Sequence, residues 1–421
     1  MSLQVVYPRC AGLDLHRKAV VACRITCDAA GAPERVVRTF GTMTADLLAL
    51  GRWLAEGAVT HVAMESTGVY WKPVFNLLEG SFELLLVNAQ HMKAVPGRKT
   101  DVRDCEWLGD LLRHGLLKAS FVPERPQREL RELTRYRTDM IRERAAEVNR
   151  IHKTLEGANL KLGTVASDVL GLSGRAILDR IVGGATAGDA AALAQLAHGK
   201  LRAKLPALEQ ALVGVAGPHQ QFLLARQLAH VDDLEAIIAA LDAELEKRLA
   251  SVEDTVARLD AIPGVGRHTA EVIVAEVGVS VTRFPDAERL TAWAGLAPAA
   301  KMSAGKRKSA GTRKGNTALR TALLEAALAA SRTKGTALSA RYQRIAGRRG
   351  AKKAAIALAR HILEVVSVML RDGVAYEERG PATLDPRTVE RRCDRLVEQL
   401  RRLGFQAALA PLPVPQEETA A

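Results

Sequence analysis

Residues 10–27 read CAGLDLHRKAVVACRITC, and they contain two short apolar runs, 10–16 and 18–27, that alternate as β-strands do. In the first run Leu13 and Leu15 fall on one face of the strand and Asp14 falls on the other, because side chains alternate along a strand. A carboxylate inside an apolar strand costs free energy unless it is paired or bound to a cation. This stretch therefore predicts a β-sheet with one acid whose role goes beyond packing.

The chain after this stretch alternates between strand-like and helical patterns. The expected elements are a turn at 28–33 with Gly31, a strand at 35–40, a helix at 44–56, a strand at 59–65, a helix at 69–78, a strand at 82–87 and helices within 89–116. Three adjacent strands followed by alternating helices and strands is the order of the RNase H-like fold. Other α/β folds share part of this order.

Three further acids fall where they can join Asp14. Glu65 ends a predicted strand within VAMESTG (62–68), and strand ends are where α/β sheets present chemistry. Asp101 and Asp104, within KTDVRD (99–104), open a predicted helix and share one of its faces because they are three residues apart. Two strands and one helix can thus bring four carboxylates to a single cleft.

Four hard oxygen ligands suit Mg²⁺ or Mn²⁺ better than Zn²⁺. Two such ions, about 4 Å apart, activate a nucleophile and stabilise a leaving oxygen in phosphoryl transfer. Each acid alone has a simpler explanation: a helix first-turn acid for Asp101, a surface acid for Asp104, an ion-pair partner for Glu65. The combination in RNase H order favours a metal site.

The chain is strongly basic, with a formal charge of +13 over 421 residues. From Lys301 to Lys353 there are fifteen Lys or Arg and one acid, Glu325, so this block carries more than the whole excess. Such a block is typical of a surface that binds the phosphate backbone of nucleic acid. A surface that merely keeps the protein soluble is the alternative.

Composition bounds the protein class. The length predicts two or three domains, and 48% hydrophobic with 25% charged residues is typical of soluble globular proteins. Five cysteines (Cys10, Cys23, Cys27, Cys105 and Cys393) without zinc spacing indicate reduced, buried thiols. No signal-peptide pattern or apolar run of transmembrane length is present, so we expect a cytoplasmic, nucleoid-associated protein with no membrane partner.

Two charged helices are predicted in the middle of the chain. Apolar residues recur at steps of three, four or seven over 130–155 and over 224–249, which favours an antiparallel coiled-coil arm or a dimer seam, with an ordinary helical bundle as the alternative. The Ala/Gly-rich segment 160–217 is expected to be helical. A helical domain over 255–372 is expected to be interrupted at 301–316 and 346–353. A last helix starts with Asp385 as N-cap and Pro386, before a Pro-rich tail.

The helical domain contains two motifs for DNA chemistry. LDAIPGVGRHTA (259–270) is similar to a helix-hairpin-helix element, whose glycine-rich turn lets backbone N–H groups approach a phosphate, although a plain tight turn is the alternative. Downstream, GLAPAAKMSAGK (295–306) places Ser303 among cations, where its hydroxyl either donates to a phosphate or attacks it. The expected nucleic-acid contacts are Gly264, Gly266, Lys301, Lys306, Arg307, Lys308, Arg313, Lys314 and Arg320.

Taken together, these segments resemble the DEDD-type transposases of the insertion-sequence-110 family, which includes the Piv-type DNA invertases. The matching motifs are GLDLH, MESTGVYW, KTDVRD, IPGVG, AGLAP and KGNTALR, in family order over roughly residues 10–375. The joint match is specific, whereas each piece alone is not.

The resemblance implies a RuvC-like domain (1–125), a coiled-coil middle (126–254) and a C-terminal transposase domain (255–375), followed by a helix and tail (376–421) without a family counterpart. It implies a DNA recombinase that cuts and rejoins DNA through a phosphoserine linkage, in a site shared between subunits of a homodimer or homotetramer. It further implies DNA as substrate and, in some members, a guide RNA from the element. By position the serine is Ser303, but Ala304 stands where the family commonly has glycine, so Ser309 remains a second candidate.

Two other functions stay open on the residues alone. A RuvC-like nuclease would resolve branched DNA with metal alone and be indifferent to Ser303. An inactive relic would bind nucleic acid through the basic block without using the four acids.

Overall fold

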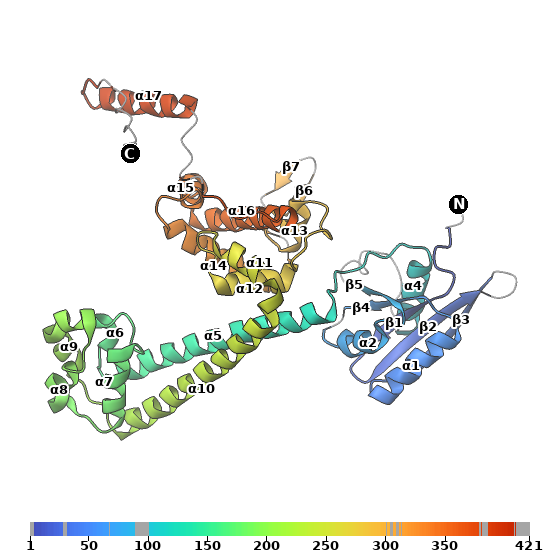
Figure 1. The fold of residues 1–421 in the computed structure, drawn as a ribbon, viewed down its shortest axis with the longest axis horizontal. Coiled ribbons are helices and arrows are strands. Elements are labelled where there is room, and N and C mark those ends of the chain that lie inside the picture. Colours follow the sequence, from blue (N-terminus) through green and yellow to red (C-terminus); the bar gives the residue numbers. More distant parts are fainter. Residues whose placement is uncertain are drawn as a thin grey trace, which may run out of the picture. The chain divides into compact units, whose positions relative to one another are not determined.

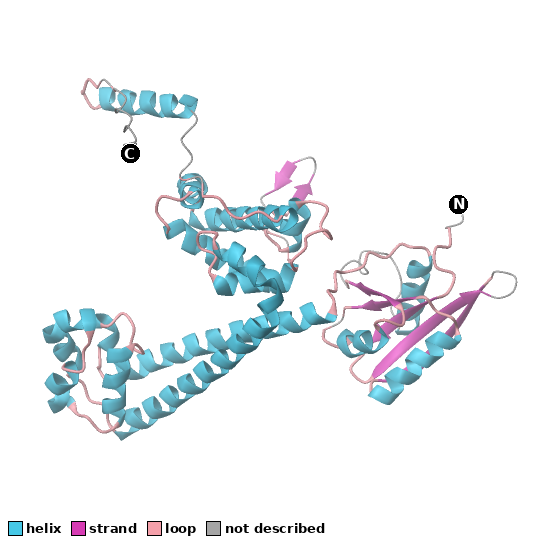
Figure 2. Cartoon of the chain, viewed as in Figure 1, coloured by secondary structure: helices cyan, strands magenta, loops and turns pink. Residues whose placement is uncertain are grey.

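The structure is a computed structural model, and it describes residues 4–27, 32–66, 68–88, 101–299, 301–303, 306–308, 311–312, 314–378, 380, 386–407 and 409. Within these, the side chains of residues 101–103, 187, 301–303, 306–308 and 386–392 lie outside the description. The chain divides into two compact units, Met1–Glu124 and Arg125–Ala421. The first is built on a sheet and the second is almost entirely helical (Figures 1 and 2).

The first unit contains a mixed five-stranded sheet of order β3-β2-β1-β4-β5. Its strands are β1 (Cys10–Leu15), β2 (Ala19–Cys27), β3 (Pro33–Gly41), β4 (His61–Glu65) and β5 (Glu83–Val87). β2 is antiparallel to its neighbours β1 and β3, and β4 and β5 continue the sheet parallel to β1. This arrangement is consistent with the expected RNase H-like domain.

Helices cover both faces of the sheet because its strands are apolar on both sides. Leu13 and Leu15 pack in one cluster with α1 (Thr44–Glu56) and α2 (Trp71–Leu78). The opposite face holds Cys10 and Cys23, which pack against α4 (Asp101–Arg113). The expected strands and helices of this unit are thus found near their predicted bounds. The predicted turn residues 28–31 and the segment 89–100 lie outside the described residues.

Two glycines let α4 lie directly on β1. A Cβ built on Gly12 would fall 2.2 Å from the Cys105 carbonyl oxygen and 2.5 Å from the Gly109 nitrogen. No side chain larger than hydrogen fits such a gap without moving the helix. The contact fixes the direction of α4, because Cys105 and Gly109 lie over Gly12 while the Arg113 carbonyl accepts from the Val6 and Tyr7 N–H groups before the strand. The N-terminus of α4 therefore lies at the end of the sheet where β1 ends.

The second unit begins with two long helices, α5 (Arg125–Gly157) and α10 (Pro218–Leu249). They run antiparallel, since Arg137 pairs with Asp242 and Arg144 pairs with Glu235. Figure 1 shows the two helices side by side. This bears out an antiparallel helix pair, while coiled-coil geometry remains a prediction.

Short helices join the far ends of this pair, as the composition of 160–217 predicts. They are α6 (Leu162–Val165), α7 (Leu172–Val182), α8 (Ala190–Ala194) and α9 (Leu205–Leu212), with 3₁₀ turns at Ala187–Asp189 and Gly199–Lys204. They share a separate apolar core with the helix pair, in which Ile151 and Leu155 of α5 and Leu224 of α10 are buried.

The C-terminal end of α10 leads into a helical body with its own core, against which Leu130 and Leu133 of α5 also pack. Its elements are a 3₁₀ turn (Ala250–Val252), α11 (Glu253–Asp260), α12 (Arg267–Val277), α13 (Ala287–Trp293), the hairpin strands β6 (Lys301–Ser303) and β7 (Lys306–Lys308), α14 (Thr317–Arg332), α15 (Ala337–Arg349) and α16 (Ala351–Asp372). Every residue of α12 from Ala270 to Val277 is buried, so this helix is the centre of the body.

One expected interruption of this body is much smaller than predicted. The Gly/Lys/Arg-rich segment 346–353 was expected to break the helices, but α15 continues to Arg349 and α16 begins at Ala351. Arg and Lys are good helix formers, so only Gly350, at φ +82°, ends one helix and begins the next. The expected last helix is α17 (Pro386–Arg402), and its predicted cap Asp385 lies outside the described residues.

The cysteines are free thiols, as expected, but they are not all buried. Cys10, Cys23 and Cys105 are buried in the first unit, and burial raises the pKa of each thiol to about 12. Cys27 and Cys393 are partly exposed, which corrects the expectation for these two. No helix among the described residues is long and apolar enough to cross a membrane.

Candidate active site

Asp14 lies near the end of β1, on the face that α4 covers. Leu13 and Leu15 point into the opposite cluster, so alternation places Asp14 with Cys10 and Gly12. Its side chain is 16% exposed, and its Oδ2 lies 3.1 Å from His16 Nε2. The apolar strand thus holds a carboxylate that is only slightly exposed, with His16 as a polar partner.

Glu65 is the last residue of β4, next to β1. The two strands are parallel and pair Leu13 with Met64, so Asp14 and Glu65 are the next residues along the two neighbouring strands. Met64 packs with α1 and α2, whereas Ala63 packs with α4. Alternation therefore puts Glu65 on the same face as Asp14. The sheet register thus places the two residues side by side on neighbouring strands, while a shared metal site stays a prediction.

The other two acids lie in the first turn of α4. Asp101 is the first residue of α4, and Asp104, three residues later, is exposed; this end of the helix lies toward the end of β1. Cys105, the next residue, lies on the side of α4 that packs against the sheet. Burial is the main cause of its raised pKa, and the negative charge of Asp14 adds to it. The helix thus starts at the sheet end where Asp14 and Glu65 lie. The side chain of Asp101 is outside the description.

The donor chemistry at this end of the sheet suits a divalent cation. Carboxylate oxygens are the ligands that Mg²⁺ and Mn²⁺ prefer, and a nearly buried Asp14 beside Glu65 in an apolar sheet is stabilised by such a charge. Among the residues whose side chains are described, no group of three or more His, Cys, Asp or Glu side chains is close enough to hold a metal. Metal ligation by the four acids is therefore a proposal about residues that the fold places at one end.

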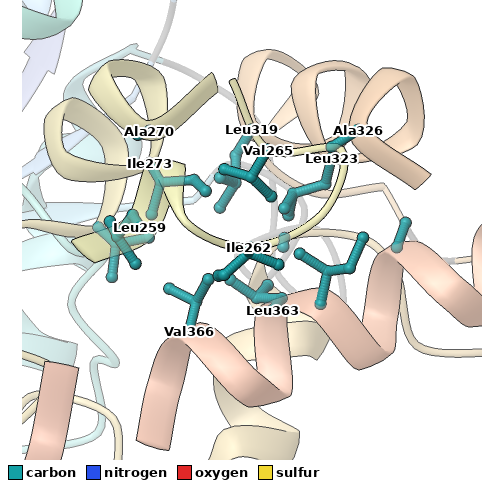
Figure 3. Packing of buried hydrophobic residues seen from close by; sticks show 14 of the residues in the cluster. Leu259, Ile262, Val265, Ala270, Ile273, Leu319, Leu323, Ala326, Leu363 and Val366 are labelled. Carbon is teal, nitrogen blue, oxygen red and sulfur yellow. The ribbon is translucent and has the colours of Figure 1, made fainter. Parts of the chain in front are cut away.

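In the second unit, the glycine-rich turn Pro263–Gly266 joins α11 to α12. Gly264 has φ +86°, and a Cβ there would fall 2.4 Å from the Ala330 nitrogen and 2.5 Å from the Ala326 oxygen of α14. Figure 3 shows Ile262, just before the turn, and Val265, within it, inside the core. Packing alone thus requires glycine at 264. Gly266, which is exposed with open space around it, is the position where a phosphate can approach.

Ser303 lies at the end of β6, in a two-stranded hairpin that projects from the body. Its backbone pairs with Lys306 of β7. Closer to the body, the Ala299 N–H donates to the Gly311 carbonyl at 2.9 Å, and Pro298 pairs with Thr312. The serine is therefore part of a ladder with a fixed base, and not of an irregular loop. Ser309 lies outside the described residues.

The base of this hairpin is locked by two glycines and an asparagine. A Cβ on Gly315 would fall 2.3 Å from the Gly295 nitrogen, so the two strands of the loop touch backbone to backbone. The Asn316 N–H donates to the Trp293 carbonyl at 3.1 Å, and its side chain caps α14 by accepting from the Leu319 N–H at 3.1 Å. The motif Lys314-Gly315-Asn316 thus closes the loop that carries Ser303.

A buried carboxylate, Glu276 of α12, holds that closure in place. It is fully buried and accepts from Asn316 Nδ2 at 2.6 Å and from Arg135 of α5 at 2.7 and 3.0 Å. Arg131, also on α5, lies 3.3 Å away, and burial lowers its pKa to about 10 although Glu276 opposes that shift. We name Glu276, Arg131, Arg135 and Asn316 the Glu276 cluster. It connects helices α5, α12 and α14.

The expected nucleic-acid contacts are only partly described. Lys314 is exposed beside the hairpin base, and Arg320 is half-buried on the first turn of α14. The backbones of Lys301, Lys306, Arg307 and Lys308 form the hairpin, but their side chains and the whole of Arg313 are outside the description. Their contacts with nucleic acid remain predictions.

Sequence reasoning missed two groups at these sites. His16 was read as part of a motif, yet it is the partner of Asp14. The Glu276 cluster was missed entirely, although an acid inside the apolar run VIVAEV (272–277) has the same signature that drew attention to Asp14. A buried acid in an apolar helix needs partners, but the sequence does not say that they come from α5 and α14.

Comparison with known proteins covers both sites. A family model described as transposase matches residues 11–160, which include the four acids. A second, described as transposase of the IS116/IS110/IS902 family, matches residues 256–343, which include the turn, the hairpin and Ser303.

Two curated relatives agree with these matches. The "Insertion element IS110 uncharacterized 43.6 kDa protein" of Streptomyces coelicolor is 35% identical over 128 residues, which is 30% of this chain and 31% of that protein. The "Probable family 20 transposase" of Pseudomonas aeruginosa is 26% identical over 322 residues, or 75% of this chain and 85% of that protein. The chain thus spans about a third of the first relative and most of the second.

Proposed function

Because the chain belongs to the IS116/IS110/IS902 family of transposases, we propose that it cuts and rejoins DNA to move its own insertion element, using Ser303 as nucleophile and four metal-binding carboxylates. The carboxylates are Asp14, Glu65, Asp101 and Asp104. The observation that carries the proposal is the convergence of β1, β4 and the start of α4 at one end of the sheet. The same proposal includes an RNA guide and an oligomer with a shared active site. It also includes action on the cell's own DNA in the cytoplasm.

The reaction we propose exchanges one phosphodiester for another. The Ser303 oxygen attacks the phosphorus, a phosphoserine ester forms, and the bond from phosphorus to one deoxyribose oxygen breaks. The serine proton passes to a base, and the departing deoxyribose oxygen receives a proton. In the second half, a deoxyribose hydroxyl attacks the phosphoserine ester, releases the serine and restores a DNA backbone. No energy cofactor is consumed, since the number of phosphodiesters is conserved.

The metal, when bound, supplies positive charge that lowers the cost of negative charge on the phosphate. The chain's own residues orient that charge. His16 holds Asp14 on its open side, and the Gly12–Gly109 contact holds the start of α4 at the end of β1. In the second unit, Lys314 and the hairpin cations neutralise the phosphate oxygens as serine attacks.

The decisive experiment is the trapping of a covalent protein–DNA adduct that survives denaturant, followed by mapping of the residue that bears the nucleotide. We expect the adduct in the wild-type protein and in Ser309→Ala, and its loss in Ser303→Ala. An adduct lost only in Ser309→Ala would move the nucleophile to Ser309. Normal recombination by Ser303→Ala would exclude the serine mechanism.

The carboxylates are tested by Asp14→Asn, with Glu56→Gln as the matched control. Glu56 is an exposed acid at the end of α1, away from the proposed cluster. We expect Asp14→Asn to suppress adduct formation and to abolish the rise in melting temperature that Mg²⁺ or Mn²⁺ causes, whereas Glu56→Gln changes neither. A Mg²⁺-dependent rise that persists in Asp14→Asn would exclude this site.

A second candidate function is a nuclease that resolves branched DNA without the serine. It is favoured by the location of all four acids in the first unit, which has its own cores. This function predicts free phosphate ends, no adduct and full activity of Ser303→Ala.

A further inference from the structure

A second group of cations lies at the corner where α15 meets α16. It consists of Arg344, Arg348, Arg349, Lys352 and Lys353, which we name the corner cations. All five are exposed, and Gly350 separates the helices that carry them. Gly350 is also exposed, and a Cβ built on it would meet nothing within 4 Å. The middle of the group therefore carries no side chain that would keep a ligand away from the backbone.

The corner cations have no acidic residue near them in the sequence. The sequence contains no Asp or Glu between Glu325 and Glu364. Across the part of the chain that the structure describes, none of the five is in a salt bridge, and the contact seen is from Arg348 Nε to the Arg344 carbonyl at 3.3 Å. Cations further along α16 differ, because Arg360 pairs with Glu364 and Arg371 pairs with Asp372. Among the described residues, the corner thus carries five exposed charges without a salt bridge.

The scaffold behind the corner is rigid. On α16, Leu358, Ile362 and Leu363 are fully buried in the core of the helical body. On α15, Leu338 is buried and Tyr342 packs against the same core. The backbones that carry the cations are therefore fixed before any ligand binds, which lowers the conformational entropy lost on binding. Repulsion among five exposed positive charges is relieved when a polyanion binds.

We propose that the corner cations form a DNA-backbone contact separate from the Gly264–Gly266 turn and the Ser303 hairpin. The ligand is the phosphodiester backbone of duplex DNA, bound without reading sequence, because exposed Arg and Lys side chains neutralise phosphates and carry no base-specific geometry here. This inference rests on the proposed function for the identity of the nucleic acid as DNA. It adds a site that holds the duplex while the reaction takes place elsewhere in the protein.

The test measures how affinity for a short DNA duplex depends on salt. The variant is Arg348→Gln/Arg349→Gln/Lys352→Gln in the full-length protein. The control, Lys153→Gln/Lys200→Gln/Lys247→Gln, removes the same number of exposed charges from the second unit outside the helical body. Each phosphate contact contributes about 0.9 to the slope of log K against log salt, so loss of three contacts lowers the slope by roughly 2.7. We expect this drop, with weaker binding to every duplex sequence, in the corner variant alone.

A charge-retaining variant, Arg348→Lys/Arg349→Lys, guards against a folding artefact and is expected to keep the wild-type slope. Equal slopes for the corner variant and the control would overturn the proposal. So would a drop seen with a structured RNA of the same charge but not with duplex DNA. The two proposals fail separately, because adduct formation by Ser303 is measured at protein concentrations that saturate DNA binding. If the wild-type protein forms no adduct, the serine mechanism is overturned. The salt slope still decides whether the corner cations contact DNA.

Discussion

At the scale of single residues, buried charged side chains hold neighbouring helices of the second unit together. Glu276 is fully buried, and its carboxylate accepts hydrogen bonds from Arg135 and Asn316 and forms an ion pair with Arg131. A buried charge that loses its partner is strongly destabilising, whereas exposed pairs contribute little. The Glu276 cluster is therefore where a single substitution has the largest effect on the body.

We predict that Glu276→Gln lowers the free energy of unfolding by about 3 kcal/mol, since it removes the carboxylate charge that faces the buried Arg131 guanidinium. Arg135 is half-exposed and regains water, which keeps the loss from being larger. The measurement is urea unfolding followed by circular dichroism. Glu244→Gln, which breaks an exposed pair with Arg248, is the control and is expected to change little. Equal effects of the two substitutions would show that the cluster adds nothing to stability.

His268 makes stability depend on pH. It lies beside Arg137 in the interface between α5 and α12, and burial, assisted by Arg137, lowers its pKa to about 4. The folded state therefore binds fewer protons than the unfolded state, whose histidine has a pKa near 6.5. The contribution of neutral His268 to the free energy of unfolding is therefore present in full above pH 6.5 and is lost as the pH falls toward 4.

We predict that the melting temperature of the wild-type protein falls more steeply between pH 6.5 and pH 4 than that of His268→Gln. The difference in melting temperature between the two proteins at each pH reports the effect of His268, because the other groups titrate alike in both. Glu271, whose pKa is raised mainly by burial, is one such shared group. Parallel melting curves across this range would show that His268 is not the source of the pH dependence.

At the scale of elements, the contact between β1 and α4 positions the carboxylates. Gly12→Ala would place a methyl group 2.2 Å from the Cys105 carbonyl oxygen, so the helix must shift. We predict a loss of about 1–3 kcal/mol in the stability of the first unit, as for other overpacked cores, together with loss of metal-dependent activity. Melting curves and adduct yield measure the two effects.

The control for that substitution is Gly157→Ala at the end of α5, where a Cβ meets nothing within 4 Å and φ is not positive. There alanine is expected to be neutral or slightly stabilising. If Gly12→Ala melts like the wild type and keeps its activity, α4 is not fixed by the glycine contact.

The elements also show what the sequence could and could not predict. Alternation around Asp14 and the run ending at Glu65 predict their strands, because period two in apolar residues has few other causes. The helix starting at Asp101 was predicted from KTDVRD (99–104), whose two acids are three residues apart and share one helix face. The role of Gly12 was not, since a close approach depends on a partner ninety-seven residues away. At 346–353, the Gly/Lys/Arg-rich composition suggested that the helices break over several residues. Only Gly350 interrupts them, because arginine and lysine are good helix formers.

At the scale of the whole molecule, the two units have separate cores, with no residue shared between the apolar clusters of residues up to Val122 and those from Leu130 onward. The packing that stabilises one unit is therefore distinct from that of the other. The sequence predicts this division from the change of pattern near residue 125, where strand alternation gives way to long charged helices.

We predict two unfolding transitions in calorimetry, and that residues 1–124 produced alone melt at the temperature of one of them. Gly12→Ala is expected to move that transition and leave the other in place, whereas Glu276→Gln is expected to move only the other. A single cooperative transition, shifted by both substitutions, would show that the units fold as one.

The Glu276 cluster has a mechanical consequence for the second unit. Arg131 and Arg135 lie on the long helix α5, and Asn316 closes the loop that carries Ser303, so one carboxylate holds both. If α5 rotates or bends near Arg135, the carboxylate must follow it or give up a hydrogen bond at Asn316. A force applied at the distant end of the helix pair would therefore act, through Glu276 and Asn316, on the backbone at the base of the hairpin that carries Ser303.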